Sequence, residues 1–73
     1  MEQENLKSTI AHWLSQLPSK YREVVVRRYG LLGHEVETLE DVGIEVGLTR
    51  ERVRQIQTDA LRRLKRILDK DEE

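Results

Sequence analysis

A long amphipathic pattern in the second half of the chain constrains its fold most strongly. From Thr49 onwards apolar residues recur every three or four positions, at Val53, Ile56, Ala60, Leu61, Leu64 and Leu68. This spacing predicts a helix of about four turns with one buried stripe. Thr49 is a suitable N-cap for it, and the helix is expected to end near Leu68, with a frayed tail over residues 69–73.

Two shorter helices are predicted upstream. The first ends before Pro18 and carries an apolar stripe of Leu6, Ile10, Trp13, Leu14 and Leu17. The second begins near Pro18 or Ser19 and stops at Gly30, which suits a left-handed C-terminal cap. Its predicted core positions are Tyr21, Val24, Val25 and Tyr29. Since one helix of a small domain cannot bury every face, one valine of the run 24–26 is expected on the surface.

A loop over residues 31–37 and a third, short helix complete the pattern. Thr38 can cap this helix with Asp41 three residues later, and Gly47 ends it. Its inner side carries Leu39, Val42 and Val46. No strand-like alternation appears, so the predicted fold is all-α: a four-helix domain over residues 1–73 that ends in a helix-turn-helix at about 38–57 with a long C-terminal recognition helix.

Composition excludes several classes of function. The 73 residues suffice for one domain, cysteine is absent, and the two histidines are far apart in sequence, so we predict no metal site and no cofactor. The apolar runs are far shorter than the roughly 20 residues that cross a bilayer, so no membrane partner is expected. An enzyme is the weakest alternative, because neither paired catalytic carboxylates nor a nucleophile with its base can be made out.

Charge is distributed unevenly along the chain. Residues 49–67 hold seven cations and two anions, a net charge of +5, although the whole chain carries −1. This basic segment coincides with the second helix of the predicted helix-turn-helix, in which Gly43 is small at a close approach and Gly47 supplies a positive φ. The pattern favours double-stranded DNA as the partner. The alternatives are the output domain of a dimeric helix-turn-helix regulator and a helical adaptor that binds protein without reading DNA.

Helical rotation separates the polar side chains of the last helix from its apolar stripe. Glu51, Gln55, Thr58 and Arg62 lie opposite the stripe, and Arg54 and Lys65 lie beside them. In a major groove arginine can bond to guanine, glutamate can accept from cytosine, and glutamine can pair with adenine. A carboxylate here is costly near phosphates unless it accepts from a base or orients a neighbouring arginine.

Three runs of sequence carry a resemblance to a known family. They are Thr38-Leu39-Glu40-Asp41-Val42-Gly43, Gly47-Leu48-Thr49-Arg50-Glu51-Arg52-Val53-Arg54-Gln55-Ile56 and Ala60-Leu61-Arg62-Arg63-Leu64. With Leu17-Pro18, Arg22-Glu23-Val24 and Arg27-Arg28-Tyr29-Gly30-Leu31 upstream, the chain resembles region 4 of primary-type bacterial sigma factors. Segment 27–33 and the sequence after Thr38 are especially similar to the stationary-phase branch.

The resemblance implies recognition of the −35 promoter element by a domain docked on the β-subunit flap of RNA polymerase. By motif position, the residues implied to face bases are Arg50, Glu51, Arg54 and Gln55. Those implied to lie by the phosphate backbone are Leu39, Glu40, Thr49 and Arg52. Arg62 and Lys65 match basic positions that meet transcription activators, but Asp59 replaces a lysine of the housekeeping members, which predicts a different activator-facing surface.

Further expectations follow from the same resemblance. Transcription activators and anti-sigma factors are additional partners, the isolated chain is expected to be a monomer, and the implied location is the bacterial cytoplasm, at the nucleoid. The surface valine of the run 24–26 would either join the flap-docking surface or simply be exposed. A free-standing sigma factor needs more domains for the −10 element and strand opening, so we expect the chain to be a C-terminal piece of a longer protein.

Overall fold

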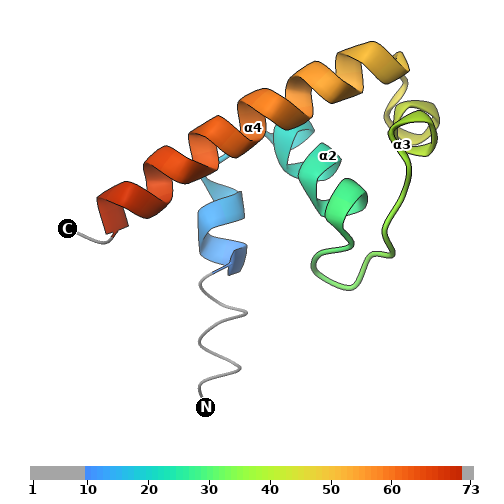
Figure 1. Ribbon diagram of the computed structural model, residues 1–73. Coiled ribbons are helices and arrows are strands. Elements are labelled where there is room, and N and C mark those ends of the chain that lie inside the picture. Colours follow the sequence, from blue (N-terminus) through green and yellow to red (C-terminus); the bar gives the residue numbers. More distant parts are fainter. Residues whose placement is uncertain (1–9, 72–73) are drawn as a thin grey trace.

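The computed structural model describes residues 10–71 (Figure 1). This part of the chain contains a helical segment at 10–15, α2 at Ser19–Tyr29, α3 at Leu39–Val46 and α4 at Arg50–Asp71, and it contains no strand. The all-α prediction is confirmed. Leu6 of the first predicted helix lies outside the described residues.

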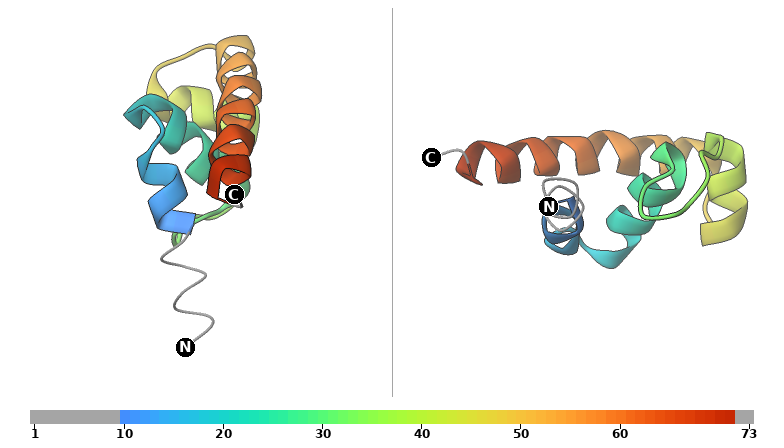
Figure 2. Two further views of the ribbon diagram at one scale, coloured as in Figure 1. Left: turned by 90° about the vertical axis from the view of Figure 1, so that its left-hand side faces the viewer. Right: turned by 90° about the horizontal axis from the view of Figure 1, so that it is seen from below.

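The long helix α4 forms one side of the molecule. Figure 1 shows the helical segment 10–15 below the second half of α4, α2 below its middle, and α3 beside its start. The two turned views in Figure 2 agree that these three elements pack on the same side of α4. The opposite side of α4 is therefore left free of protein in the described part of the chain.

Two apolar clusters hold the helices together. The first joins segment 10–17, α2 and α4 through Leu14, Leu17, Val25, Val26 and Ala60. The second joins α2, α3 and α4 through Val24, Val42, Val53 and Ile56. Tyr21 packs against both clusters. Because α4 contributes to each cluster, its packed side is fixed over most of its length.

The run Val24-Val25-Val26 is buried throughout, at 0%, 1% and 7% exposure, so the expectation of one surface valine was wrong. Val24 belongs to the cluster with α3, whereas Val25 and Val26 belong to the cluster with segment 10–17. The expectation assumed that α2 has a single packed face, but α2 lies between two clusters. Val24 and Val25 therefore cannot form part of a docking surface, and Val26 only borders a surface hollow with Leu32.

Tyr29 is 41% exposed, contrary to its prediction as a core residue. Gly30 adopts the left-handed conformation (φ 64°) and ends α2, as predicted. The following Leu31 then donates its N–H to the Val26 carbonyl at 3.0 Å and packs against the first cluster. The Gly30 N–H donates to the same carbonyl, so two donors after α2 share one of its last acceptors. Leu31 thus packs against the core, whereas Tyr29 does not.

Two details of α4 differ from prediction. The helix continues to Asp71, so residues 69–71 are helical rather than frayed, whereas 72–73 lie outside the described residues. Neither glycine nor proline interrupts this stretch, and Lys70 is favourable in the last turn because of the helix dipole. Leu61 is 42% exposed because it follows buried Ala60 and is rotated about 100° from it.

Candidate nucleic-acid interface

A tight turn joins α3 to α4. Gly47 has φ 75°, and both its N–H and that of Leu48 donate to the Gly43 carbonyl. A Cβ placed on Gly43 would lie 2.5 Å from the Leu48 carbonyl oxygen, closer than real Cβ atoms come. Glycine is therefore required at position 43 by the backbone of the turn itself, and the turn fixes the start of α4 against α3.

Threonine caps begin both helices of this pair. The Thr38 hydroxyl accepts from the Asp41 N–H at 3.1 Å, and the Thr49 hydroxyl accepts from the Arg52 N–H at 3.1 Å. Each cap satisfies one of the N–H groups that a helix start leaves without an intrahelical partner. The remaining N–H groups and the helix dipole leave both starts favourable for anions.

The four side chains predicted to face bases are all exposed on the first turns of α4: Arg50, Glu51, Arg54 and Gln55. Two of them form a bidentate pair, in which Arg54 donates from Nε at 3.0 Å and from Nη2 at 2.6 Å to the two oxygens of Glu51. The hydrogen bond from Arg54 lowers the pKa of Glu51, and the same bond raises the pKa of Arg54. Both side chains thus remain charged over the physiological pH range.

Gln55 is paired in the same region. Its Oε1 accepts from Arg52 Nη1 at 3.4 Å. Arg52 and Gln55 were assigned to different sets, one beside phosphates and one facing bases, and the structure brings the two side chains into contact. Gln55 also contributes to lowering the pKa of Glu51 through a side-chain hydrogen bond, so it is linked to both Arg52 and Glu51.

The start of α3 lies beside these side chains. A hollow of about 430 Å³ is lined by Leu39 together with Arg50, Glu51 and Arg54. A second hollow of about 480 Å³ continues along the start of α3 and is lined by Arg28, Val36, Glu37, Thr38, Leu39, Glu40 and Arg50. Part of each predicted set therefore borders these two hollows, with Leu39 half-buried and Glu40 exposed. Thr49 and Arg52 line neither hollow but are exposed at the start of α4.

Arg28 was missed by the sequence analysis. It comes from α2, yet it lines the hollow shared by Glu40 and Arg50, and its Nη1 donates to the Glu37 carbonyl at 3.2 Å. The available signal was the pair of arginines directly before Gly30, but only the fold shows that the second one reaches the start of α3.

Arg62 and Lys65, predicted to face activators, are exposed on the second half of α4. Arg62 is continuous with the first turns of the helix, because it lines a hollow of about 330 Å³ with Arg54, Gln55, Thr58 and Asp59. Neighbouring Arg63 is turned towards α2.

The Arg63 guanidinium lies 4.6 Å from the centre of the Tyr21 ring and 3.3 Å from Asp59. A hydrogen bond from Tyr21 is the main cause that lowers the pKa of Asp59, and Arg63 adds to the effect. Asp59 is therefore part of a polar contact between α2 and α4, in addition to bordering the exposed surface.

Within residues 10–71, no group of histidine, aspartate and glutamate side chains is arranged to hold a metal ion. None of the described helices is long and apolar enough to cross a membrane. What these residues do offer is a polar, largely cationic helix face next to two helix starts. Such a face is suited to binding a polyanion.

Comparison with known proteins gives a consistent result. The family model described as "Sigma-70, region 4" matches residues 13–66. The chain is 57% identical to the RNA polymerase sigma factor RpoS of Coxiella burnetii over 65 residues, which cover 89% of this chain and 18% of that protein. It is 44% identical to RNA polymerase sigma factor RpoD of Helicobacter pylori over 63 residues, covering 85% of this chain and 9% of the relative. The chain thus spans less than a fifth of the length of these curated relatives.

Proposed function

The chain belongs to the sigma-70 region 4 family, and from this we propose that it recognises the −35 element of bacterial promoters as part of an RNA polymerase initiation complex. The higher identity to the RpoS relative than to the RpoD relative agrees with the predicted stationary-phase branch. In this role the chain binds DNA and protein without a catalytic step, and it acts on the nucleoid in the bacterial cytoplasm.

One observation carries the proposal. The unpacked side of α4 presents Arg50, Glu51, Arg54 and Gln55 on its first turns, and the start of α3 lies in the same hollow. A recognition helix enters the major groove with its first turns while the preceding helix lies across the backbone. The arrangement of α3 and α4 meets both requirements.

Base reading is assigned to the exposed side chains of α4. Arg54 is held in bidentate contact by Glu51, which limits the number of conformations that its guanidinium adopts before binding. An arginine in the major groove bonds to both acceptors of guanine, and the free acceptor capacity of Glu51 suits the amino group of cytosine. Holding Arg54 in place lowers the entropy cost of forming such a contact.

Positioning on the duplex is assigned to the helix starts. The backbone N–H groups at Leu39 and Glu40 point out of the start of α3, where the helix dipole favours a phosphate. Thr49 and Arg52 extend this contact from α4. Such contacts carry no sequence information, but they fix the register in which the bases are read.

The isolated chain is expected to bind weakly. Only one helix enters the groove, and the +5 charge of residues 49–67 is attached to a body that is acidic overall. Attachment to the polymerase makes the DNA contact effectively intramolecular, which raises its occupancy without any new contact.

Docking on the polymerase flap is assigned to an apolar hollow away from the DNA-facing side chains. It has a volume of about 390 Å³ and is lined by Ile10, Leu31, Leu32 and Gly33. Leu32 is 53% exposed and has φ 53°, a conformation that costs a side chain with a Cβ about 1–2 kcal/mol. Neither the backbone strain at Leu32 nor the exposure of its apolar side chain stabilises the fold, which supports a role of Leu32 in binding.

Replacement of Arg54 tests base reading. Arg54→Ala should weaken binding to a −35 duplex about tenfold and weaken binding to a scrambled duplex much less, because one bidentate base contact is lost. Lys65→Ala is the matched control, since it removes an exposed cation farther along the same helix. Equal losses on both duplexes for the two variants would mean that α4 contributes only charge. Unchanged DNA binding with intact flap binding would favour the adaptor alternative.

A further inference from the structure

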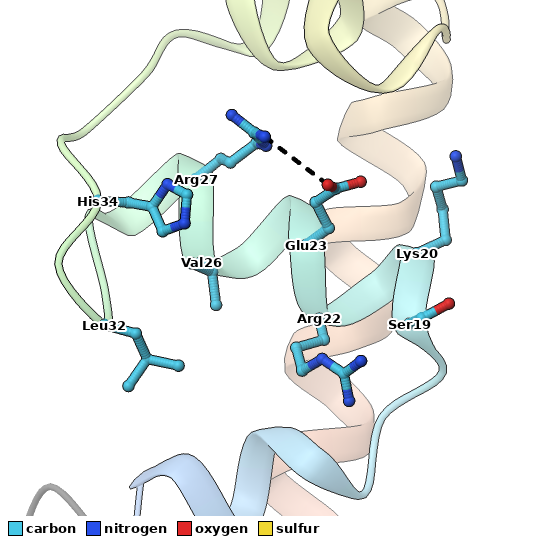
Figure 3. A pocket seen from close by; sticks show the side chains of 8 residues that line it. All are labelled: Ser19, Lys20, Arg22, Glu23, Val26, Arg27, Leu32 and His34. Carbon is cyan, nitrogen blue, oxygen red and sulfur yellow. Dashed lines mark ion pairs between the residues drawn. The ribbon is translucent and has the colours of Figure 1, made fainter.

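Arg27, in the last turn of α2, contacts carboxylates from three separate stretches of chain. Its guanidinium lies 3.7 Å from Glu23 on α2, 3.4 Å from Glu37 in the loop before α3, and 4.0 Å from Glu45 near the end of α3. Figure 3 shows the pair with Glu23 beside the loop that carries Leu32. Since Glu37 precedes α3 and Glu45 lies in its last turn, one cation connects both ends of α3 to α2.

Two further hydrogen bonds hold Glu37 against the same turn of α2. Its N–H donates to the Arg27 carbonyl at 3.0 Å, and its carbonyl accepts from Arg28 Nη1 at 3.2 Å. Glu37 is the residue directly before the Thr38 cap, so the start of α3 is fixed by contacts of both backbone and side chain. The Arg27 side chain is only 22% exposed, which makes its contacts less screened than those of a surface pair.

The apolar packing of α3 is centred on one fully buried side chain. Val42 is the one buried apolar side chain on this eight-residue helix, and Leu39 and Val46 are half-buried. Leu39 and Val46 pack against the same cluster from the two ends of the helix. The contacts of Arg27 with Glu37 and Glu45 add polar restraints at these ends, where the apolar side chains are only half-buried.

Building on the proposed function, we propose that Arg27 is a positioning residue for DNA recognition. By holding both ends of α3 through Glu37 and Glu45, it fixes the backbone donors at the start of α3 relative to the base-facing side chains of α4. Leu39, at that start, lines the same hollow as Arg50 and Arg54. A change in the tilt of α3 therefore changes the distance between the phosphate contacts and the base contacts.

The test compares two duplexes, one with a −35 element and one scrambled to the same length and composition. A loss of folded protein lowers both affinities in proportion. A misplaced α3 lowers the affinity for the −35 duplex more, because only that complex needs phosphate and base contacts in register. For Arg27→Met, the ratio of the two affinities should fall about threefold to tenfold, within the range of couplings between contacting groups.

Two variants serve as further arms. Glu45→Gln removes one contact at a residue whose side chain is 56% exposed, so the fold is retained and the ratio should fall in the same direction but less. Arg63→Met removes an ion-paired arginine at the α2–α4 contact and should leave the ratio at the wild-type value. If Arg27→Met does not fold, the affinity ratios of Glu45→Gln and Glu37→Gln test the inference, and both should fall below the wild-type ratio.

Amide hydrogen exchange of the free chain provides a readout without DNA. Exchange should accelerate in α3 for Arg27→Met and Glu45→Gln, with no comparable change in the second half of α4. A wild-type affinity ratio in the variants of Arg27, Glu37 and Glu45, with unchanged exchange in α3, would overturn the inference while leaving the proposed function intact. A wild-type chain that does not distinguish the two duplexes would instead overturn both.

Discussion

Glu51 and Arg54 face each other one turn apart on α4 and share two hydrogen bonds, at 3.0 and 2.6 Å, on the unpacked side of the helix. Their side chains are 62% and 54% exposed, so the pair contributes little to folding. The pair instead restricts the conformation of Arg54, because an arginine held by a carboxylate meets a partner in a defined orientation. The two residues therefore act together in the proposed reading of bases.

Glu51→Gln is expected to separate binding from stability. Glutamine cannot form the charged bidentate pair, so Arg54 becomes more mobile and discrimination at its base pair should fall about fivefold. The free energy of unfolding should change by less than about 0.5 kcal/mol, because the pair is exposed. Binding to duplexes with single base changes, combined with urea denaturation, measures both. A large loss of stability with unchanged discrimination would contradict this role.

Gly43→Ala should destabilise the fold by about 2 kcal/mol, because the added Cβ would lie 2.5 Å from the Leu48 carbonyl oxygen and force the turn apart. Ile44→Ala is the control: Ile44 is 73% exposed on the same helix and should have almost no effect. Chemical denaturation of the two variants checks the difference. Equal stabilities would show that the turn accommodates a side chain at position 43.

Leu32→Asn should separate docking from folding. Asparagine tolerates a positive φ better than leucine, so stability should be unchanged or about 0.5 kcal/mol higher. Binding to the isolated flap domain of the polymerase β subunit should weaken about tenfold, because one apolar side chain is lost from the interface. Ile44→Gln removes an exposed apolar residue elsewhere and serves as the control. If both variants bind the flap like the wild type, docking uses another surface.

Asp59 predicts a dependence of stability on pH. Tyr21, and to a lesser extent Arg63, lower the pKa of this carboxyl below its ordinary value of 3.8, so the folded state binds its proton less readily than the unfolded state. The resulting stabilisation is present above the unfolded pKa and is lost as the pH falls through the folded pKa. Asp59→Asn should thus be less stable than the wild type at neutral pH.

The two proteins should converge in stability well below pH 3.8. Urea denaturation at neutral pH and at a pH well below 3.8 measures the difference in free energy of unfolding between the wild type and Asp59→Asn. If this difference is the same at both pH values, the ionised carboxylate of Asp59 does not stabilise the contact between α2 and α4.

Much of the fold could be predicted because its local signals agree. Helix starts at Thr38 and Thr49, and stops at Gly30 and Gly47, are set by short-range chemistry that needs no knowledge of the partners. The burial of the valine run could not be predicted in this way. Whether α2 packs on one side or two depends on where other helices lie, and periodicity within α2 carries no information on that.

The candidate site was predictable in part. Helical rotation places Glu51 and Gln55 opposite the apolar stripe with Arg54 beside them, the family resemblance adds Arg50, and the structure shows all four side chains to be exposed. The pairing of Arg52 with Gln55 and the approach of Arg28 to the start of α3 depend on rotamers and on tertiary packing. The same is true of the contacts of Arg27 with Glu37 and Glu45, which are ten and eighteen residues away in the sequence.

The most direct test of the central claim is an NMR titration of the isotope-labelled chain with a duplex that contains a −35 element. The account predicts that the largest amide shift changes occur in residues 49–57 and at Leu39 and Glu40, are larger than with a scrambled duplex, and leave the loop at Leu31–Gly33 nearly unchanged. Changes centred on that loop, or of equal size with both duplexes, would contradict recognition of DNA sequence by α4.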